Sequence, residues 1–189
     1  PRYILQSAIE RVEKLGFRPF AAYEFEFYIF DGSIGEIADS QWRNIKPVAK
    51  SGYCYSMLHH ASSSDFMGQI RKYLRAAGHE VEATNSEYGP GQYEININYA
   101  GALKAADTAI FVKHAIKDIA AKHGLTATFM AKPRAEWAGS SGHVHLSLST
   151  PNGEPAFANP SDPTALSETC LLYTSDAADD LLCVDLGGR

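Results

Sequence analysis

Two acidic residues within an aromatic segment are the first positions at which this sequence suggests chemistry. Residues 20–30 read FAAYEFEFYIF, an alternation of aromatic and other residues that is typical of a β-strand. Because residues two apart in a strand share a face, Glu24 and Glu26 should point to one side and the neighbouring phenylalanines to the other. Adjacent carboxylates repel unless water screens them or a cation lies between them. Taken alone, the segment favours a hydrated sheet face over a metal site.

A second pair of carboxylates flanks a predicted turn. Glu87 and Glu94 lie on either side of the segment 88–93, which reads YGPGQY. Its Gly-Pro-Gly core permits a sharp reversal of the chain, so the two carboxylates can return close to each other. An ordinary hairpin with one acid at each shoulder explains the same residues equally well.

A third segment carries two histidines. Residues 139–148 read GSSGHVHLSL, and His143, His145 and Ser147 should share one face of a strand. A neutral imidazole is a good metal ligand, and the small residues before it would let a substrate approach the backbone. The alternative is a polar strand face with two hydrogen-bonded histidines, because His-x-His occurs in many unrelated sites.

The three segments together supply four carboxylates and one or two imidazoles, all from predicted strands. If they converge in one groove, the oxygen-rich ligand set suits two Mg²⁺ or Mn²⁺ ions better than structural Zn²⁺, which favours cysteine and histidine. Paired hard cations that also bind phosphate are typical of phosphoryl transfer. The combination therefore points to a metal-dependent reaction of a phosphorylated substrate.

Periodicity and turn signals predict the elements that position these residues. Helices are expected over residues 2–15, 65–77 and 102–123, each followed by a glycine. The last helix contains the apolar residues Leu103, Ala106, Ile110, Ile116 and Ile119. Strands are expected over 20–30, 80–86, 92–98, 125–131 and 143–149, with loops over 33–62 and 150–169. This order predicts an α/β (α+β) fold with a mostly antiparallel sheet and helices on one side.

Composition excludes several classes of protein. The 189 residues are 45% hydrophobic and 21% charged, which excludes a wholly disordered chain. A net charge of −5 argues against a general binder of nucleic acid. No apolar run reaches the roughly 18 residues of a membrane span. Three cysteines without a Cys-x-x-Cys pair favour a reducing, cytoplasmic setting, and Cys54, with no visible partner, is expected to be an inert thiol.

The end of the sequence differs from the rest. Residues 170–189 read CLLYTSDAADDLLCVDLGGR and resemble the translation of a transposase-type sequencing adapter. We therefore expect this tail to be non-native, the alternative being an acidic C-terminal helix. Because the chain opens Pro-Arg-Tyr without an initiator methionine, it is also expected to have been cut from a longer protein.

Several stretches, taken together, resemble the catalytic domain of the glutamine synthetase family. They read PRYILQSAIERVEKLGF, AAYEFEFYIF, VEATNSEYGPGQYEIN, TATFMAKP and GSSGHVHLSL. They occur in the family's order and cover nearly all of residues 1–150. The resemblance implies a curved, mostly antiparallel sheet with flanking helices, and it makes residues 1–169 part of a glutamine-synthetase-type catalytic domain.

The resemblance also implies metal ligands. Glu26, Glu87 and Glu94 match the ligands of one ion. Glu24 and His143 match two ligands of a second ion, which lies over the terminal phosphate of the nucleotide. The implied cofactors are two Mg²⁺ or Mn²⁺ ions, with ATP as a substrate.

Further positions match residues that bind the substrates. Glu82, Tyr99, His145 and Ser147 match residues that contact or lie near the nucleotide, and Gly139 matches a glycine whose backbone contacts glutamate. No residue is assigned a certain catalytic role, and the resemblance favours a phosphate contact over a base for His145. Trp137 is either a loop anchor or a substrate contact, and the sequence leaves both open.

The implied reaction has two steps. The glutamate γ-carboxylate attacks ATP to give an acyl phosphate, which ammonia or an organic amine then converts to an amide. Ala138 stands where many members have an asparagine associated with glutamate binding, which leaves both the acid and the amine open. The hairpin and the GSSGHVH segment are similar to those of ligases that use polyamines or ethanolamine.

The family's small N-terminal domain, its phosphate-binding arginines and the last ligand of the second ion would lie outside this sequence. The fragment is therefore expected to be inactive alone, and the full-length protein to form a homo-oligomeric ring without nucleic acid or membrane partners. Two alternatives come from other classes. One is a non-catalytic structural or regulatory member of the family, and the other is a zinc-dependent hydrolase that uses the His-x-His segment.

Overall fold

A computed structural model describes residues 1–43, 45–50, 54–56, 64–162 and 164–171 of the chain. The expected non-native tail thus lies outside the described residues except for its first two positions, and it stays a prediction. None of the helices described combines the length and apolarity that a membrane crossing requires.

The chain divides into two compact units. The larger unit consists of Ala21–Ala100 and Lys104–His145. The smaller unit consists of Pro1–Phe20, Gly101–Leu103 and Leu146–Arg189. All but one of the candidate site residues belong to the larger unit, so the site can be described within it.

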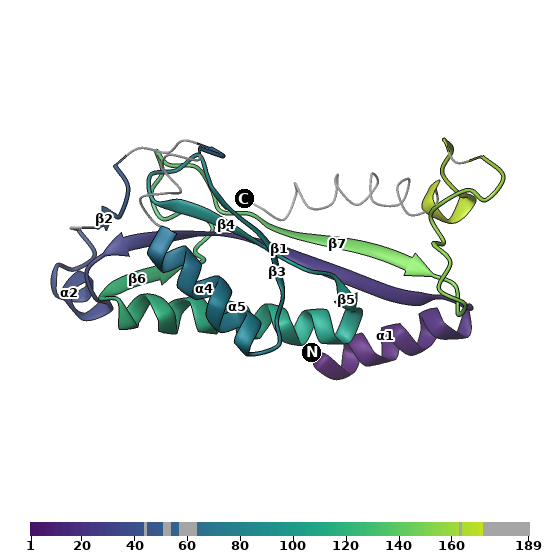
Figure 1. The fold of residues 1–189 in the computed structure, drawn as a ribbon. Coiled ribbons are helices and arrows are strands. Elements are labelled where there is room, and N and C mark those ends of the chain that lie inside the picture. The colour runs from purple at the N-terminus through teal and green to yellow at the C-terminus, as the bar shows by residue number, and fades with distance from the viewer. Residues whose placement is uncertain (44, 51–53, 57–63, 163, 172–189) are drawn as a thin grey trace. The chain divides into compact units, whose positions relative to one another are not determined.

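The helices and strands follow the expected order. They are α1 (Arg2–Lys14), β1 (Arg18–Asp31), α2 (Ile34–Asp39), β2 (Lys46–Pro47), α4 (Ser64–Ala76), β3 (Val81–Ser86), β4 (Gln92–Ile97), β5 (Ala100–Gly101), α5 (Ala102–Lys122), β6 (Leu125–Thr128) and β7 (Gly142–Ser149). The α/β fold class with an antiparallel sheet and flanking helices is confirmed (Figure 1). The strand expected to reach residue 131 ends earlier, at Thr128.

The loop expected over residues 33–62 is wrong in part, because it contains α2 and β2. A capping box starts α2: the Ser33 hydroxyl accepts from the Glu36 N–H at 3.3 Å, and the Glu36 carboxylate accepts from the Ser33 N–H at 2.7 Å. This reciprocal pair satisfies two backbone donors that a helix start otherwise leaves open. The Ser-x-x-Glu signal was present in the sequence and identifies the helix.

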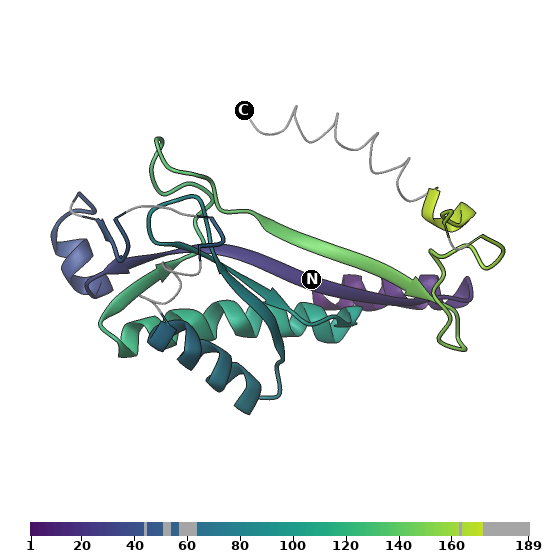
Figure 2. The same cartoon turned by 45° about the horizontal axis from the view of Figure 1, so that its top comes forward.

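β1 is the central strand of the sheet. The order β2-β1-β4-β3 runs across one part of it, and β6 and β7 also pair with β1 (Figures 1 and 2). The pairings of β1 with β2, β4 and β6 are antiparallel, as is that of β3 with β4. In the register of β1 and β4, Glu26 lies opposite Glu94 and Phe27 opposite Tyr93.

One face of the sheet packs against α4 and α5, which Figure 1 shows side by side below the strands. The strands contribute Phe27, Ile29, Tyr93, Ile95 and Ile97 to this core, and α4 contributes Phe66, Met67, Ile70 and Leu74. These strand positions alternate with those of the carboxylates, so Glu24, Glu26 and Glu94 must face away from the two helices. The expectation that acidic and aromatic residues of β1 occupy opposite faces is confirmed.

Of the apolar positions noted in α5, Ile116 and Ile119 are buried. The buried positions of this helix also include Ala105, Ala109 and Val112, whereas Ile110 is 62% exposed. Alanines let the helix approach the sheet closely, and so they lie at the contact in place of the larger Ile110.

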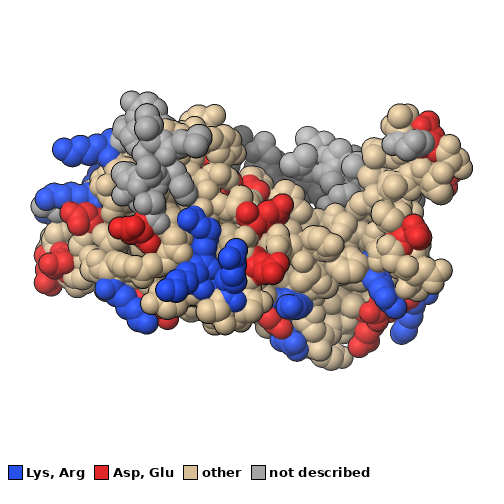
Figure 3. All heavy atoms as spheres, in the orientation of Figure 1, with Lys and Arg blue, Asp and Glu red and all other residues tan. Residues whose placement is uncertain are grey.

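Figure 3 shows basic side chains gathered over α4, whose sequence contains Arg71, Lys72 and Arg75.

Candidate metal centre

Three of the predicted ligands lie on the sheet face opposite α4 and α5. Glu24 and Glu26 come from β1, and Glu94 comes from β4. Glu26 and Glu94 are direct cross-strand partners, a relation that places Cβ atoms about 4.5–5.5 Å apart. Like charges in such a pair destabilise a sheet unless a cation or hydrogen-bond donors compensate them. Two donors do so at Glu94, because Asn85 and Asn96 both donate to its Oε1, at 2.9 and 2.8 Å.

Glu87 joins this face from the turn after β3. Its N–H donates to the carbonyl of Gln92 at 2.9 Å, which closes the hairpin and returns the chain to Glu94. The side chain is buried, and its Oε2 lies 3.8 Å from the thiol of Cys54. Burial raises the pKa of Glu87, and the negative charges of Glu94 and Glu26 raise it further. A buried carboxylate that two others destabilise is the environment that a divalent cation would relieve.

The histidine segment meets the carboxylates at Glu24. His143 Nδ1 lies 2.5 Å from Glu24 Oε1, and His145 Nε2 lies 3.3 Å from Glu24 Oε2. The hydrogen bond with Glu24 raises the pKa of His143. Burial alone would raise the pKa of Glu24, but the hydrogen bonds with the two imidazoles lower it below its ordinary value. The structure therefore brings together the two residues predicted to share an ion, Glu24 and His143.

The loop before β7 lies against the same carboxylates. Both the Ser141 hydroxyl and the Gln92 amide donate to Glu26, the latter at 2.9 Å. The Tyr28 hydroxyl donates to the carbonyl of Ala138 at 2.7 Å, and burial together with the charge of Glu26 raises the pKa of Tyr28 to about 12. Trp137 stacks on Tyr28 with ring centroids 5.5 Å apart. Of its two predicted roles, the structure shows that of a loop anchor.

The donor set fits hard divalent cations, since four carboxylates and an imidazole of one unit face the same side. As placed, no three His, Cys, Asp or Glu side chains among the described residues are close enough to hold an ion. Each carboxylate is instead turned toward a protein donor, such as Gln92 for Glu26 or His143 for Glu24. Ion binding would require rotation about side-chain torsions, without a change in the register of the strands.

Known proteins resemble this chain over most of its length. The family model for the glutamine synthetase catalytic domain matches residues 1–176. The chain belongs to the glutamine synthetase family. Among curated relatives, a glutamate–isopropylamine ligase of Pseudomonas sp is 68% identical over 168 residues, which are 89% of this chain and 37% of that protein. A glutamine synthetase of Thermus thermophilus is 37% identical over 174 residues, 92% of this chain and 37% of that protein.

Solved structures of the glutamine synthetase family share the fold. The chain superposes on apo GmaS without ligand with a TM-score of 0.77 and 30% identity, over 90% of this chain and 39% of that one. The chain thus spans only about two fifths or less of the length of the proteins that it matches.

The residues that the family resemblance linked to substrates lie in different places. Gly139 is exposed in the loop before β7, and His145 contacts Glu24. Glu82 is exposed at a bulge of β3, where the register with β4 shifts between Val81 and Ala83. Tyr99 is 71% exposed and lines a cavity of about 250 Å³ beyond the end of β4. Ser147 is exposed in the part of β7 that belongs to the smaller unit.

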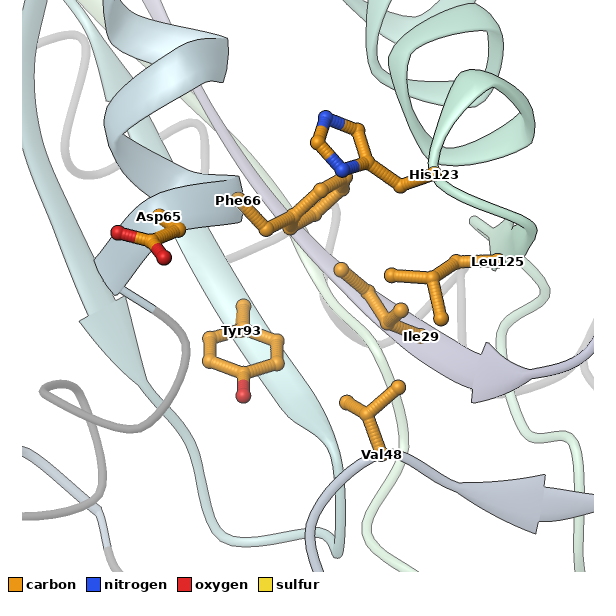
Figure 4. A pocket seen from close by; sticks show the side chains of 7 residues that line it. All are labelled: Ile29, Val48, Asp65, Phe66, Tyr93, His123 and Leu125. Carbon is orange, nitrogen blue, oxygen red and sulfur yellow. The ribbon is translucent and has the colours of Figure 1, made fainter.

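Another cavity, of about 210 Å³, lies on the helix-covered face of the sheet. Its lining consists of Ile29, Val48, Asp65, Phe66, Tyr93, His123 and Leu125 (Figure 4). Ile29 and Tyr93 belong to the core face of β1 and β4, so this cavity is separated by the sheet from the carboxylates. None of the predicted metal ligands lines it.

Sequence reasoning missed two residues of the site. Gln92 stands within the GPGQYEIN stretch and shares a strand face with Glu94, but no charge or metal-ligand pattern singled it out. Cys54 was expected to be an inert thiol without a partner for nucleophilic chemistry, and its contact with the Glu87 carboxylate was not foreseen. That contact was beyond local patterns, because it joins positions 33 residues apart. Burial and the charge of Glu87 raise the pKa of Cys54, which agrees with an unreactive thiol.

Proposed function

We propose that the protein containing this chain is an ATP-dependent ligase that joins glutamate to ammonia or an organic amine, with an organic amine preferred. Membership of the glutamine synthetase family supports the ligase class. The 68% identity to a glutamate–isopropylamine ligase supports the amine. Ala138, where the family resemblance leads us to expect asparagine, is a further difference at the substrate loop.

The cross-strand pair of Glu26 and Glu94, with the buried Glu87 beside it, is the observation that carries this proposal. A protein without ions gains nothing from placing these like charges together, since the arrangement costs folding free energy. This argument favours a ligase over a non-catalytic member of the family. It also favours hard cations over the zinc of the hydrolase alternative, because oxygen donors predominate.

In this proposal Glu26, Glu87 and Glu94 hold one Mg²⁺ or Mn²⁺ ion, and Glu24 and His143 hold a second. When bound, the ions would neutralise phosphate charge that otherwise repels the glutamate carboxylate. The acyl phosphate is the intermediate that we infer from the family resemblance, and the amine displaces its phosphate in the second step.

The remaining predicted residues bind and orient the substrates. The Gly139 backbone would contact glutamate, held in place by the Gln92 amide at its carbonyl. His145 would contact phosphate, its ring turned toward the same carboxylate as His143. Glu82, Tyr99 and Ser147 would contact or lie near the nucleotide. We propose that the full-length protein forms a homo-oligomeric ring and acts in the cytoplasm, and that this chain alone is inactive.

The test uses the full-length protein and measures phosphate released from ATP with glutamate and a panel of isopropylamine, methylamine, ethanolamine and ammonia. We expect release to require glutamate and an amine, and isopropylamine to exceed ammonia. Glu26→Gln and Glu94→Gln should each lower kcat/KM about a hundredfold, because each removes charge that holds an ion. The control Glu13→Gln removes one charge from the exposed surface of α1 and should leave activity unchanged.

Mn²⁺ binding gives a second, independent measurement. Titration of the ion into the full-length protein should show weaker binding by Glu26→Gln and Glu94→Gln than by the wild type or Glu13→Gln. Unchanged Mn²⁺ binding by both site variants would contradict the proposed ligand set. Release of phosphate that is indifferent to glutamate and to every amine would contradict the ligase itself.

A further inference from the structure

We infer that Gln92 is a positioning residue that couples the metal carboxylate Glu26 to the loop at Gly139. The inference rests on the proposed function, since it assigns Glu26 to an ion and Gly139 to glutamate. Its consequence is that ion binding and glutamate binding assist each other through a side chain that touches neither.

The orientation of the Gln92 amide follows from its partners. The Gly89 N–H donates to Gln92 Oε1 at 2.9 Å, and because a backbone N–H can only donate, the amide oxygen must face it. The amide nitrogen therefore faces the opposite way. It donates to Glu26 Oε2 at 2.9 Å and to the Gly139 carbonyl at 2.8 Å, and it lies 3.3 Å from the Ser140 hydroxyl.

This amide has no freedom to exchange one partner for another. Gln92 is 2% exposed, so water cannot replace a lost donor at low cost. Its two N–H groups reach the metal carboxylate and the substrate loop at the same time, while its oxygen is fixed by the turn at Gly89. A rotation of Glu26 toward an ion is thus transmitted to the Gly139 carbonyl by one rigid planar group.

A parallel link strengthens the coupling. The Ser141 hydroxyl donates to Glu26 Oε1, and the Glu26 N–H donates to the Ser141 carbonyl at 3.1 Å. One oxygen of Glu26 therefore has a donor from the loop and the other has the Gln92 amide of β4, and each oxygen keeps a second lone pair for an ion. Hydrogen-bonded partners of this kind orient metal ligands, and their loss typically costs 10–100-fold in metal affinity.

The loop is anchored at its other end independently of Glu26. Tyr28 holds the Ala138 carbonyl, and the Ser140 N–H donates to the Ala131 carbonyl at 2.7 Å. Between these anchors, the Gly139 carbonyl depends on Gln92 among the contacts that the structure describes. Removal of the amide should therefore release this carbonyl without unfolding the loop.

The experiment compares Gln92→Leu with the wild-type full-length protein. Mn²⁺ affinity is measured by titration with and without glutamate, and hydrogen exchange is measured in peptides that cover residues 138–142 with and without Mn²⁺. In the wild type we expect glutamate to tighten Mn²⁺ binding about tenfold, within the range of coupled sites. Mn²⁺ alone should slow exchange in the loop. In Gln92→Leu, glutamate should no longer tighten Mn²⁺ binding (a factor of about one), and Mn²⁺ should no longer slow exchange in the loop.

Asn96→Leu is the matched control. Asn96 donates to Glu94, another candidate ligand, and its side-chain contact in the structure is with that carboxylate and not with the loop. This variant should weaken Mn²⁺ binding yet keep the tenfold coupling and the exchange effect. If Gln92→Leu and Asn96→Leu lost the coupling and the exchange effect to the same extent, the cause would be a general loss of metal affinity, and the inference would be overturned.

A second variant covers the case in which Gln92→Leu does not fold. Ser141→Ala removes the parallel link from a half-buried position and should reduce the coupling about threefold, while circular dichroism stays unchanged. Full coupling in either folded variant overturns the inference but leaves the proposed function intact. Failure of the wild type to bind Mn²⁺ would instead overturn the proposed function, and the inference with it.

Discussion

The turn at Gly89 offers the sharpest test of how the site is held together. A Cβ added at Gly89 would lie 1.9 Å from the Tyr28 hydroxyl oxygen and 2.6 Å from the ring carbon that bears it. Contacts below 3.0 Å essentially never occur at a real Cβ, so Gly89→Ala must displace the ring or the turn. Tyr28 cannot move freely, because it is fully buried, stacks on Trp137 and donates to the Ala138 carbonyl.

The cost can be estimated from these contacts. Overpacking a tight core typically costs about 1–3 kcal/mol, and losing the Tyr28 hydrogen bond costs about 1 kcal/mol more. Alanine also restricts the unfolded chain, which offsets about 0.4–1 kcal/mol. We therefore expect Gly89→Ala to lower the free energy of unfolding by about 1–3.6 kcal/mol.

Urea denaturation of the purified chain, followed by tryptophan fluorescence, measures this free energy. Trp137 reports on the affected cluster directly, and a Trp42→Phe background removes the signal of the other, 56% exposed tryptophan. The control is Gly35→Ala in α2, where the nearest atom to the added Cβ is the Ser33 hydroxyl oxygen, 3.9 Å away. It should gain up to about 1 kcal/mol from helix propensity.

A double-mutant cycle identifies the cause. Tyr28→Phe alone should cost about 1 kcal/mol, because it removes the hydrogen bond to Ala138. In the Gly89→Ala background it should cost less than that, since the shortest collision with the new methyl group goes with the hydroxyl, although two ring carbons still lie 2.6 and 2.8 Å from that group. Wild-type stability of Gly89→Ala, or simple additivity of the two changes, would refute the packing that we describe.

Two further predictions concern titratable groups of the ion-free protein. The His143 pKa, measured by NMR, should exceed its ordinary value of about 6.5, and Glu24→Gln should reduce the increase, because the hydrogen bond with Glu24 is its largest cause. Because folding raises the pKa of His143, its pairing with Glu24 stabilises the fold fully below the His143 pKa of the unfolded state. This stabilisation is lost as the pH rises through the His143 pKa of the folded state. An unshifted pKa of His143 would contradict the contact with Glu24. Cys54 should react with iodoacetamide more slowly than a free thiol at pH 8, and Glu87→Gln should accelerate the reaction. Equal rates in both proteins would contradict the Cys54–Glu87 contact.

The two faces of β1 could be predicted because the signal is local. Alternation of side chains is a property of any strand, so four consecutive residues place Glu24 and Glu26 on one side. The pairing of Glu26 with Glu94 could not be derived from periodicity, because register depends on how a distant hairpin meets the strand. For that step the resemblance to a family supplied what local patterns do not contain.

The errors have physical causes of the same kind. Of the apolar positions noted in α5, Ile116 and Ile119 are buried, but Ile110 is exposed because close packing favours the alanines that line the contact. Gln92 was overlooked because its importance lies in its partners, which come from Glu26 and from a loop 47 residues away. A neutral amide in a strand carries no sign of such a role until the fold brings those partners to it.

Packing on one face of the sheet explains how the other face can hold several carboxylates close together. Ile95, between Gln92 and Ile97 on β4, is fully buried on the helix side, so packing there fixes the strand irrespective of what the other face carries. Repulsion between Glu26 and Glu94 can then be relieved only by side-chain rotation, by donors such as Gln92, or by cations. A substitution in the core should therefore change the stability of the fold before it changes the affinity for ions. Neutralising a carboxylate on the opposite face should do the reverse, because the strand that carries it is already held by its packing against the helices.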